Sequence, residues 1–184
     1  MKKINEYLLK INMLSLSDNE FSVINFLVRN FAERLTIRSI AKKLGFSAAG
    51  VFNILKKLEK ENIVVGQKLG TGLFYYINFE SKIAGHLAAI VLAYSEEKLK
   101  IDIEKFRQAN TAIFDGKSLL IITDSMTFLD LTIPNISIIS KTDDEAMSLF
   151  RKKDTELLEI LKKGVVLFGE DKFVNIIKNC VQVY

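Results

Sequence analysis

The sequence has one cysteine, one proline, one histidine and no tryptophan. With Cys180 alone, neither an internal disulfide nor a cysteine-based zinc site can form within one chain. The longest apolar runs, such as LAAIVLA at 87–93, fall far short of the roughly 20 residues that a membrane span needs. His86 lies in the helical-looking segment KIAGHLAAI, where packing or a place on the helix surface is the expectation and a ligand or catalytic role the alternative.

The composition predicts a folded protein, because 49% of the 184 residues are apolar and 26% are charged. This length is enough for one large domain or two small ones. The first residues, MKKINEYLLKINML, open with the basic pair of a signal peptide, but Lys10 interrupts the apolar stretch and no small-residue cleavage site follows. We therefore expect a cytoplasmic protein.

Positive charge is concentrated in the first part of the sequence. Residues 1–80 carry twelve Lys and Arg against seven Asp and Glu, which gives +5, whereas residues 81–184 carry fourteen against fifteen, which gives −1. A basic first part indicates a polyanionic partner there and a different task for the remainder.

Three helices and a hairpin are predicted before residue 80. The first helix follows an N-cap at Ser17 or Asp18, and TIRSIAKKL forms a second that Thr36 caps and Gly45 ends. The third runs from the cap Ser47 to about 61, with Asn62 as its left-handed terminator. The segments IVVGQKL and LFYYIN, separated by GTG, predict two strands of a hairpin.

The third helix, SAAGVFNILKKLEKE, has two contrasting sides. Val51, Leu55 and Leu58 form an apolar stripe that is typical of a core-facing side. The other side begins with small residues and becomes cationic toward its C-terminal end. Such a helix suits a DNA major groove, where small side chains let the backbone approach the bases and lysines meet the phosphates on either side.

This order of elements, from about Ser17 to Asn78, resembles the winged helix-turn-helix family of prokaryotic regulators. Its most specific parts are TIRSIAKKLGFSAAGVFNILKKLEKENIV and the hairpin VGQKLGTGLFYYI. The family pattern differs at the base-facing positions, which usually hold more polar donors than Ala-Ala-Gly-Val-Phe, and at Asn62, where glycine is commoner. The resemblance implies that DNA is bound by Arg38, Lys42, Lys43, Ser47, Ala48, Ala49, Gly50, Phe52, Asn53, Lys56, Lys57, Lys60, Lys68 and Thr71.

The second part predicts a helix over 81–95 and then a mixture of helices and strands. The small residues of the first helix, Ala84, Gly85, Ala88, Ala89 and Ala93, make it a candidate dimer contact, with packing inside its own chain as the alternative. The segment KLKIDIEKF at 98–106 fits either a strand or a helix, and we favour a helix. Beyond it, strands are predicted in TAIFDGKSLLIITD, NISIIS and GVVLFG, and helices in TDDEAMSLFRKK, DTELLEILKK and EDKFVNIIKN.

Residues from about 105 to 179 resemble a minimal nucleotidyltransferase domain, through ANTAIFDGKSLLIITD, NISIIS and LKKGVVLFGEDKFVNII. Enzymes of this family use a glycine-serine loop and two carboxylates one residue apart on a strand, which share Mg²⁺. Here only DGKS joins the first two strands, and Asp124 is followed by Ser125 and Met126 instead of a second acid. Asp115, Asp124 and Asp130 are therefore interpreted as surface or turn residues, and the domain as catalytically silent.

We therefore expect an α+β protein with a winged helix-turn-helix over 1–80, a linking helix over 81–104 and a mixed α/β nucleotidyltransferase-like domain over 105–184. The predicted function is a DNA-binding transcriptional regulator that is not an enzyme, needs no cofactor or metal, binds double-stranded DNA as a homodimer and takes an effector or protein partner on its second domain. An active nucleotidyltransferase that uses the winged helix to select its substrate, and a protein-interaction module without DNA binding, are the alternatives.

Overall fold

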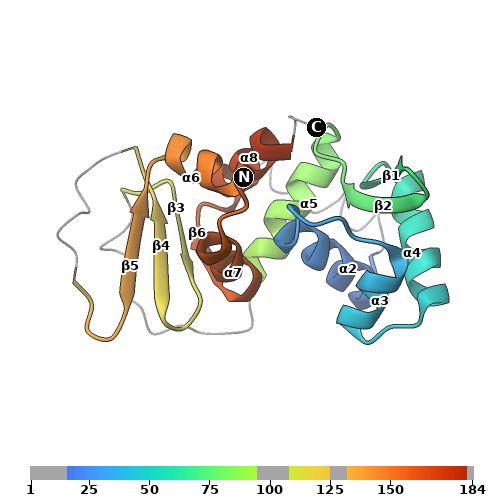
Figure 1. The fold of residues 1–184 in the computed structure, drawn as a ribbon, viewed down its shortest axis with the longest axis horizontal. Helices are drawn as coiled ribbons and strands as arrows, with labels where there is room; N and C mark the ends of the chain where they lie inside the picture. The colour runs from blue at the N-terminus through green and yellow to red at the C-terminus, as the bar shows by residue number, and fades with distance from the viewer. Residues whose placement is uncertain (1–15, 95–107, 125–131, 182–184) are drawn as a thin grey trace, which may run out of the picture.

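The computed structural model describes residues 16–94, 108–124 and 132–181. They form a winged-helix half and a half built on a mixed sheet, with one helix lying between them (Figure 1). The elements of the first half are α2 (Asp18–Arg29), α3 (Ile37–Leu44), α4 (Ala48–Lys60), β1 (Val64–Leu69) and β2 (Gly72–Ile77). The predicted three helices and hairpin are confirmed, in the predicted order.

Local sequence signals set the ends of these helices. The side-chain oxygens of Ser17, Thr36 and Ser47 accept backbone N–H groups in the first turns of α2, α3 and α4. Gly45 ends α3 with a φ of 70°, and Asn62 follows α4 with a φ of 57°. Both are left-handed conformations, which glycine and asparagine tolerate best, so the two predicted helix stops are confirmed.

The apolar stripes of the three helices meet in one core. In α4 the side chains of Val51, Leu55 and Leu58 are completely buried, as their spacing predicted. The hairpin closes this core from the side: β1 and β2 pair in antiparallel register, and Tyr75 of β2 also bridges to Leu35. The other residues that line this core include Val23, Ile24, Leu27, Val28, Ile40, Ile63 and Ile77.

The second half is a four-stranded sheet with helices against it. Its strand order is β5-β4-β3-β6, with β4 and β5 parallel and the other neighbours antiparallel. Alternate residues of β3 and β4 point to opposite faces, so Ile113, Leu120 and Ile122 join the core under the helices. The elements are β3 (Thr111–Phe114), β4 (Ser118–Ile122), β5 (Ser137–Lys141), α6 (Asp143–Arg151), α7 (Thr155–Lys163), β6 (Val165–Phe168) and α8 (Glu170–Val181).

These elements confirm the strands and helices predicted for the second part, whereas the helix favoured over 98–106 lies outside the described residues. The structure is mixed α/β here, with a sheet and helices, which is the fold class expected at that level of detail.

Helix α5 (Lys82–Ala93) packs against α2 in the first half and α8 in the second, so the two halves share a continuous core. Ala84, Ala88 and Ala89 of α5 are buried within the chain. The small-residue side that the sequence offered as a dimer contact is thus used for packing inside the chain, because small side chains permit close helix approach. On its other side α5 exposes Ile83 and Tyr94, the residue that follows it.

Polar contacts also join the two halves. Arg29, at the end of α2, donates from Nη1 to the carbonyl oxygens of Leu161, at 2.8 Å, and Gly164. Lys162 forms an ion pair with Glu33 at 2.8 Å. Carbonyls at a helix C-terminus lack partners inside the helix, so the Arg29 guanidinium both satisfies the end of α7 and fixes it against α2.

Candidate nucleic-acid interface

Helix α4 presents a long exposed flank opposite its buried stripe. It begins where the Ser47 hydroxyl accepts the N–H of Gly50 at 3.0 Å, which orders the first turn. Phe52 is 47% exposed, so part of its ring is accessible to a partner. The exposed residues of this flank are Ser47, Ala48, Ala49, Phe52, Asn53, Lys56, Lys57 and Lys60, and Gly50 is half-buried.

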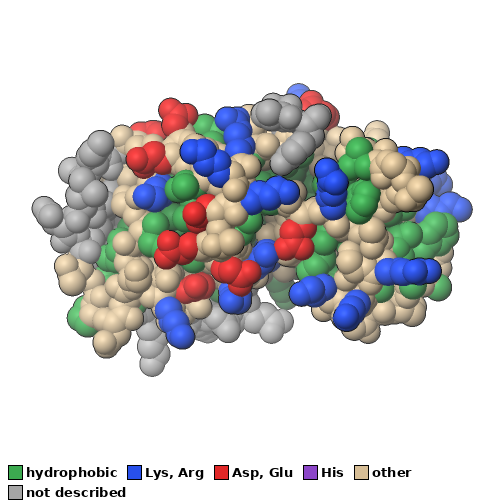
Figure 2. All heavy atoms as spheres, viewed as in Figure 1, with side chains coloured by type: hydrophobic (Ala, Val, Ile, Leu, Met, Phe, Trp, Pro, Cys, Tyr) green, Lys and Arg blue, Asp and Glu red, His purple; other side chains and the backbone are tan. Residues whose placement is uncertain are grey.

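Exposed cations of α3 add to those of α4. Arg38 lies in the first turn of α3, and Lys42 and Lys43 lie in its last turn. Within the part of the chain that the structure describes, none of these three side chains forms an ion pair, and the same holds for Lys56 and Lys60. Figure 2 shows Lys and Arg side chains over the end of the molecule that α3, α4 and the hairpin occupy.

Lys57 differs from the other lysines of this flank. Its ammonium group pairs with the Glu20 carboxylate, at 2.8 Å from Oε1 and 3.0 Å from Oε2. The sequence pattern places Lys57 among the phosphate-binding lysines, but in the structure the Glu20 carboxylate on α2 binds its ammonium group. Lys57 therefore fixes α4 against α2 in addition to contributing charge.

Glu20 is itself held in place. Its carboxylate accepts the backbone N–H of Ser17 at 2.8 Å, which completes the capping box of α2. Burial alone would raise the pKa of Glu20, but the bonds from Lys57 and Ser17 outweigh it and the pKa lies below its ordinary value. The S-x-x-E pattern at 17–20 reveals the capping box in the sequence, although it does not reveal the pairing with Lys57.

The hairpin tip projects beyond the core. Lys68 pairs in register with Leu73, and the turn at Gly70 and Thr71 connects the strands. Lys68 and Thr71, the two predicted wing contacts, are both exposed. The base of the hairpin is bonded to α4, because the Glu59 carboxylate accepts the N–H of Gly66 at 2.9 Å.

The predicted DNA-binding residues therefore lie on neighbouring elements of the winged-helix half. In Figure 1, α3, α4 and the hairpin lie at the end of the molecule away from the β5-β4-β3-β6 sheet. The described residues of the second half leave this surface uncovered, so a long rod-like ligand has access to it.

Asp115 and Asp124, two of the aspartates considered from the sequence, make hydrogen bonds within the second half. Asp115 accepts the N–H groups of Lys117 and Ser118, as expected for a turn residue. Asp124 is exposed and accepts a hydrogen bond from the Asn110 amide at 3.1 Å. The same amide nitrogen donates to Asp143 at 3.0 Å, a neighbour that sequence analysis did not identify.

Asp130, Ser125 and Met126, which the sequence argument also used, lie outside the described residues. Among the residues that are described, no group of three or more His, Cys, Asp or Glu side chains is arranged to hold a metal ion. Within the same residues, no helix combines the length and the apolar character needed to cross a bilayer. The lone His86 lies on the exposed surface of α5.

Comparison with known proteins gives a result for the first half alone. Residues 14–70 match the model of the MarR family, so this part is similar to a winged-helix DNA-binding domain of that family. The matched range contains every residue of the exposed flank of α4 and ends at the hairpin tip. A search of curated proteins found no match.

Proposed function

We propose that this chain is a transcriptional regulator that binds double-stranded DNA through α4 and the β1–β2 hairpin. The observation that carries the proposal is the division of α4 into a fully buried apolar stripe and an uncovered flank that is small at its start and cationic toward its end. The MarR-family match over residues 14–70 supports the same function, because it covers α2, α3, α4 and the first strand of the hairpin, β1.

In the proposed complex the N-terminal end of α4 enters the major groove. Ala48, Ala49 and Gly50 allow the helix backbone to approach the bases closely. Asn53 has an amide that bonds to a base edge, and Phe52 contacts a thymine methyl group. With so few polar donors at these positions, apolar contacts and DNA shape supply much of the sequence preference.

Phosphates on either side of the groove are bound by lysine and arginine. Lys56 and Lys60 on α4 reach one strand, and the cations of α3 reach the backbone beside it. These α3 residues are Arg38, Lys42 and Lys43. Lys68 and Thr71 at the hairpin tip contact the backbone or the adjacent minor groove, and Lys57 chiefly holds α4 in place for these contacts.

For the second half we propose a nucleotidyltransferase-like fold without catalysis, which serves effector binding or assembly. In support, only Asp115, Gly116 and Lys117 separate β3 from β4, which leaves no room for a loop over a triphosphate. The carboxylates of Asp124 and Asp143 both accept hydrogen bonds from the side-chain amide of Asn110, which gives these two acids a structural role. Incubation with labelled nucleoside triphosphates and Mg²⁺ tests this point: the proposal predicts no transfer of label, and stable labelling of protein or nucleic acid would contradict it.

The regulator is proposed to act as a homodimer, because a two-fold arrangement places two α4 helices on paired half-sites of DNA. Since the alanine side of α5 is buried in its own chain, a contact through α5 would have to use its opposite side, where Ile83 and Tyr94 are exposed.

Capture of genomic DNA fragments by the purified protein at two salt concentrations tests the proposed function. We expect enrichment of a limited set of fragments, with retention falling steeply at the higher concentration, since phosphate contacts release bound counterions. Failure to retain any DNA at low salt would contradict the proposal.

A further inference from the structure

One large apolar side chain of α4 lies outside the apolar cores of the chain. Phe52 is 47% exposed and, among the described residues, belongs to neither of the two clusters of buried apolar side chains. Its neighbour Ile54, by contrast, packs against the first of these clusters. The described part of the fold therefore leaves much of the Phe52 ring available to a partner.

Two alanines extend this apolar surface. Ala48 and Ala49 are both exposed and precede Phe52 by one helical turn, so the three side chains share one side of the helix. We call Ala48, Ala49 and Phe52 the α4 apolar patch. Asn53 lies one turn after Ala49 at its border, and Lys56 lies one turn after Phe52. The patch is thus bordered by an amide and, toward the C-terminal end of α4, by positive charge.

The first two turns of α4 carry no charged side chain. The first lysine of the helix is Lys56, and the first acid is Glu59. In the major groove, Arg or Lys is the usual partner of guanine, and Asp or Glu accepts from the amino group of cytosine. Within residues 48–55, only the amide of Asn53 suits two hydrogen bonds to a base edge, that of adenine. The rest of this surface has to be matched by an apolar feature of the bases, which in this groove is the 5-methyl group of thymine.

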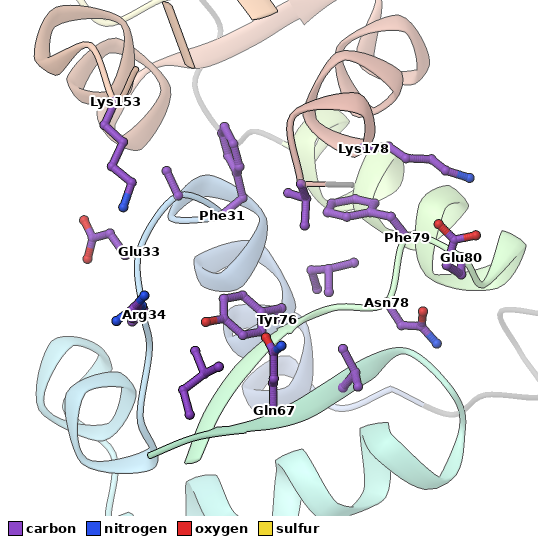
Figure 3. Close-up of a pocket in the computed structure, with 15 residues that line it drawn as sticks. Phe31, Glu33, Arg34, Gln67, Tyr76, Asn78, Phe79, Glu80, Lys153 and Lys178 are labelled. Atoms are coloured by element: carbon purple, nitrogen blue, oxygen red, sulfur yellow. The ribbon is translucent and has the colours of Figure 1, made fainter. Parts of the chain in front are cut away.

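The patch lies on a helix surface away from the pockets of the chain. Figure 3 shows a pocket of about 480 Å³ whose lining includes Phe31, Tyr76, Lys153 and Lys178, and no residue of α4 lines it. The same is true of a pocket of about 470 Å³ beside α2 and α7. A small ligand is held in a concavity of its protein. A helix surface outside these pockets instead suits a partner that is itself concave, such as the major groove of DNA, which admits an α-helix.

Cations near the patch favour a polyanionic partner over an apolar protein surface. Within the described part of the chain, Lys56 and Lys60 on α4 and Arg38 on α3 form no ion pair. A protein that covered the patch through apolar contacts would also remove water from these cations without neutralising them. DNA meets them with phosphates and at the same time presents methyl groups to the patch.

We infer that the α4 apolar patch reads the 5-methyl group of pyrimidines, an inference that rests on the proposed function. At the position that Phe52 contacts, the chain then distinguishes thymine from uracil, which differ by this methyl group alone. It also distinguishes 5-methylcytosine from cytosine there, because 5-methylcytosine carries the same group at the same place in the major groove. Methylation of a cytosine at this position therefore strengthens binding and makes the regulator responsive to the modification state of the DNA.

Single-methyl changes in the DNA test the inference directly. A genomic fragment captured by the full-length chain is synthesised as a duplex, and each thymine is replaced in turn by deoxyuridine, which removes one methyl group and keeps every hydrogen-bonding group. We expect at least one position at which the affinity falls about fourfold, the effect of leaving one methyl group unburied. At that position 5-methylcytosine should bind about fourfold more tightly than cytosine.

Variants of Phe52 separate a direct contact from an effect of the methyl group on DNA shape. Phe52→Ala removes the ring from an exposed position and keeps a strong helix former, so the thermal midpoint should be unchanged. We expect both affinity ratios, thymine to uracil and 5-methylcytosine to cytosine, to fall close to one in this variant at the contacted position, measured at low salt where weak binding is retained. Phe52→Leu keeps an apolar side chain and should retain most of each ratio. Val65→Ala is the control, because Val65 is 45% exposed but lies on β1 outside the patch, and its ratios should equal those of the wild type.

The results distinguish failure of this inference from failure of the proposed function. Methyl effects that persist unchanged in Phe52→Ala at every position would arise from DNA deformability and would overturn the inference. DNA binding without any methyl effect would also overturn it and would leave the proposed function standing. Absence of DNA binding at low salt would reject the proposed function and this inference with it.

Discussion

The carboxylate of Glu59 accepts the backbone N–H of Gly66 at 2.9 Å and thereby bonds α4 directly to the hairpin. A Cβ at position 66 would lie 2.7 Å from Oε1 of Glu59, so any larger residue there would displace the carboxylate from this contact. Helix α4 and the hairpin, the two elements that are proposed to bind DNA, are thus held at a defined separation by a side chain of α4 and the backbone of β1.

Replacing Glu59 should loosen this connection. We expect Glu59→Ala to speed amide exchange at Gly66 and to weaken DNA binding, although removal of a negative charge by itself would strengthen it. Glu61→Ala is the matched control, since Glu61 is an exposed acid at the end of α4 whose side chain, among the described residues, makes no bond to the hairpin. Amide exchange and DNA affinity should be compared in both, and identical behaviour would show that the Glu59 contact does not position the hairpin.

The ion pair of Glu20 and Lys57 gives a prediction for stability and its pH dependence. We expect Glu20→Gln to lower the free energy of unfolding by about 1–2 kcal/mol at neutral pH, because a charge-assisted bond and part of the capping box are weakened. The pKa of Glu20 is lowered in the folded state, so its contribution is present above the unfolded value, near 4.5, and is lost as the pH falls below it. Urea unfolding at a series of pH values from about 3 to about 7 measures both effects. An equal loss of stability in acid for the Glu20→Gln variant would contradict this assignment.

Arg29 should contribute to the stability of the core that the two halves share. Its guanidinium bonds to Asn25 and to the two carbonyls near the end of α7, and burial lowers its pKa from the ordinary value. Arg29→Met would leave those carbonyls without their donor, and we expect a loss of about 2–4 kcal/mol in chemical unfolding. Arg38→Met, at an exposed position, should stay within about 0.5 kcal/mol of the wild type. Comparable stability of the two variants would rule out a structural role for Arg29.

The single thiol should be protected in the folded chain. Cys180 is 3% exposed, and burial raises its pKa to about 11, with a small opposing effect of Arg151. We expect slow reaction with a thiol reagent at neutral pH and fast reaction after unfolding in urea. The thiol ionises at a lower pH in the unfolded chain than in the folded chain, so ionisation favours unfolding. The free energy of unfolding should therefore fall by up to about 2 kcal/mol as the pH rises from 9 to 11, and Cys180→Ala should remove this pH dependence. Rapid labelling of the native chain would contradict the buried placement.

Most of the first half could be predicted from the sequence because its signals are local. Ser17, Thr36 and Ser47 precede periodic apolar positions, and Gly45 and Asn62 follow them, so caps and stripes agree on the same helices. The hairpin is equally local, since β-branched and aromatic runs flank a glycine-containing turn.

The contacts that organise the candidate site were not predictable in this way. Glu20 and Lys57 are 37 residues apart, so their pairing depends on how α2 and α4 pack. The hydrogen bond from the Gly66 N–H to Glu59 corresponds to no recognisable sequence motif. The use of Ala84, Ala88 and Ala89 inside the chain, and the pocket beside Lys153 and Lys178, depend on how the two halves pack, which periodicity does not specify.

The salt dependence of DNA affinity tests the central claim most directly. Binding of the full-length chain to a mixed-sequence duplex of roughly three helical turns should be measured over a series of salt concentrations, for the wild type and for Lys56→Ala combined with Lys60→Ala. Lys152→Ala combined with Lys172→Ala, which removes two exposed lysines of the second half, serves as the control. We predict a steep decline for the wild type and the control, and a slope of log affinity against log salt that is shallower by about 1.8 in the α4 variant, or 0.9 for each lost phosphate contact. Equal slopes and affinities in all three proteins would contradict the account.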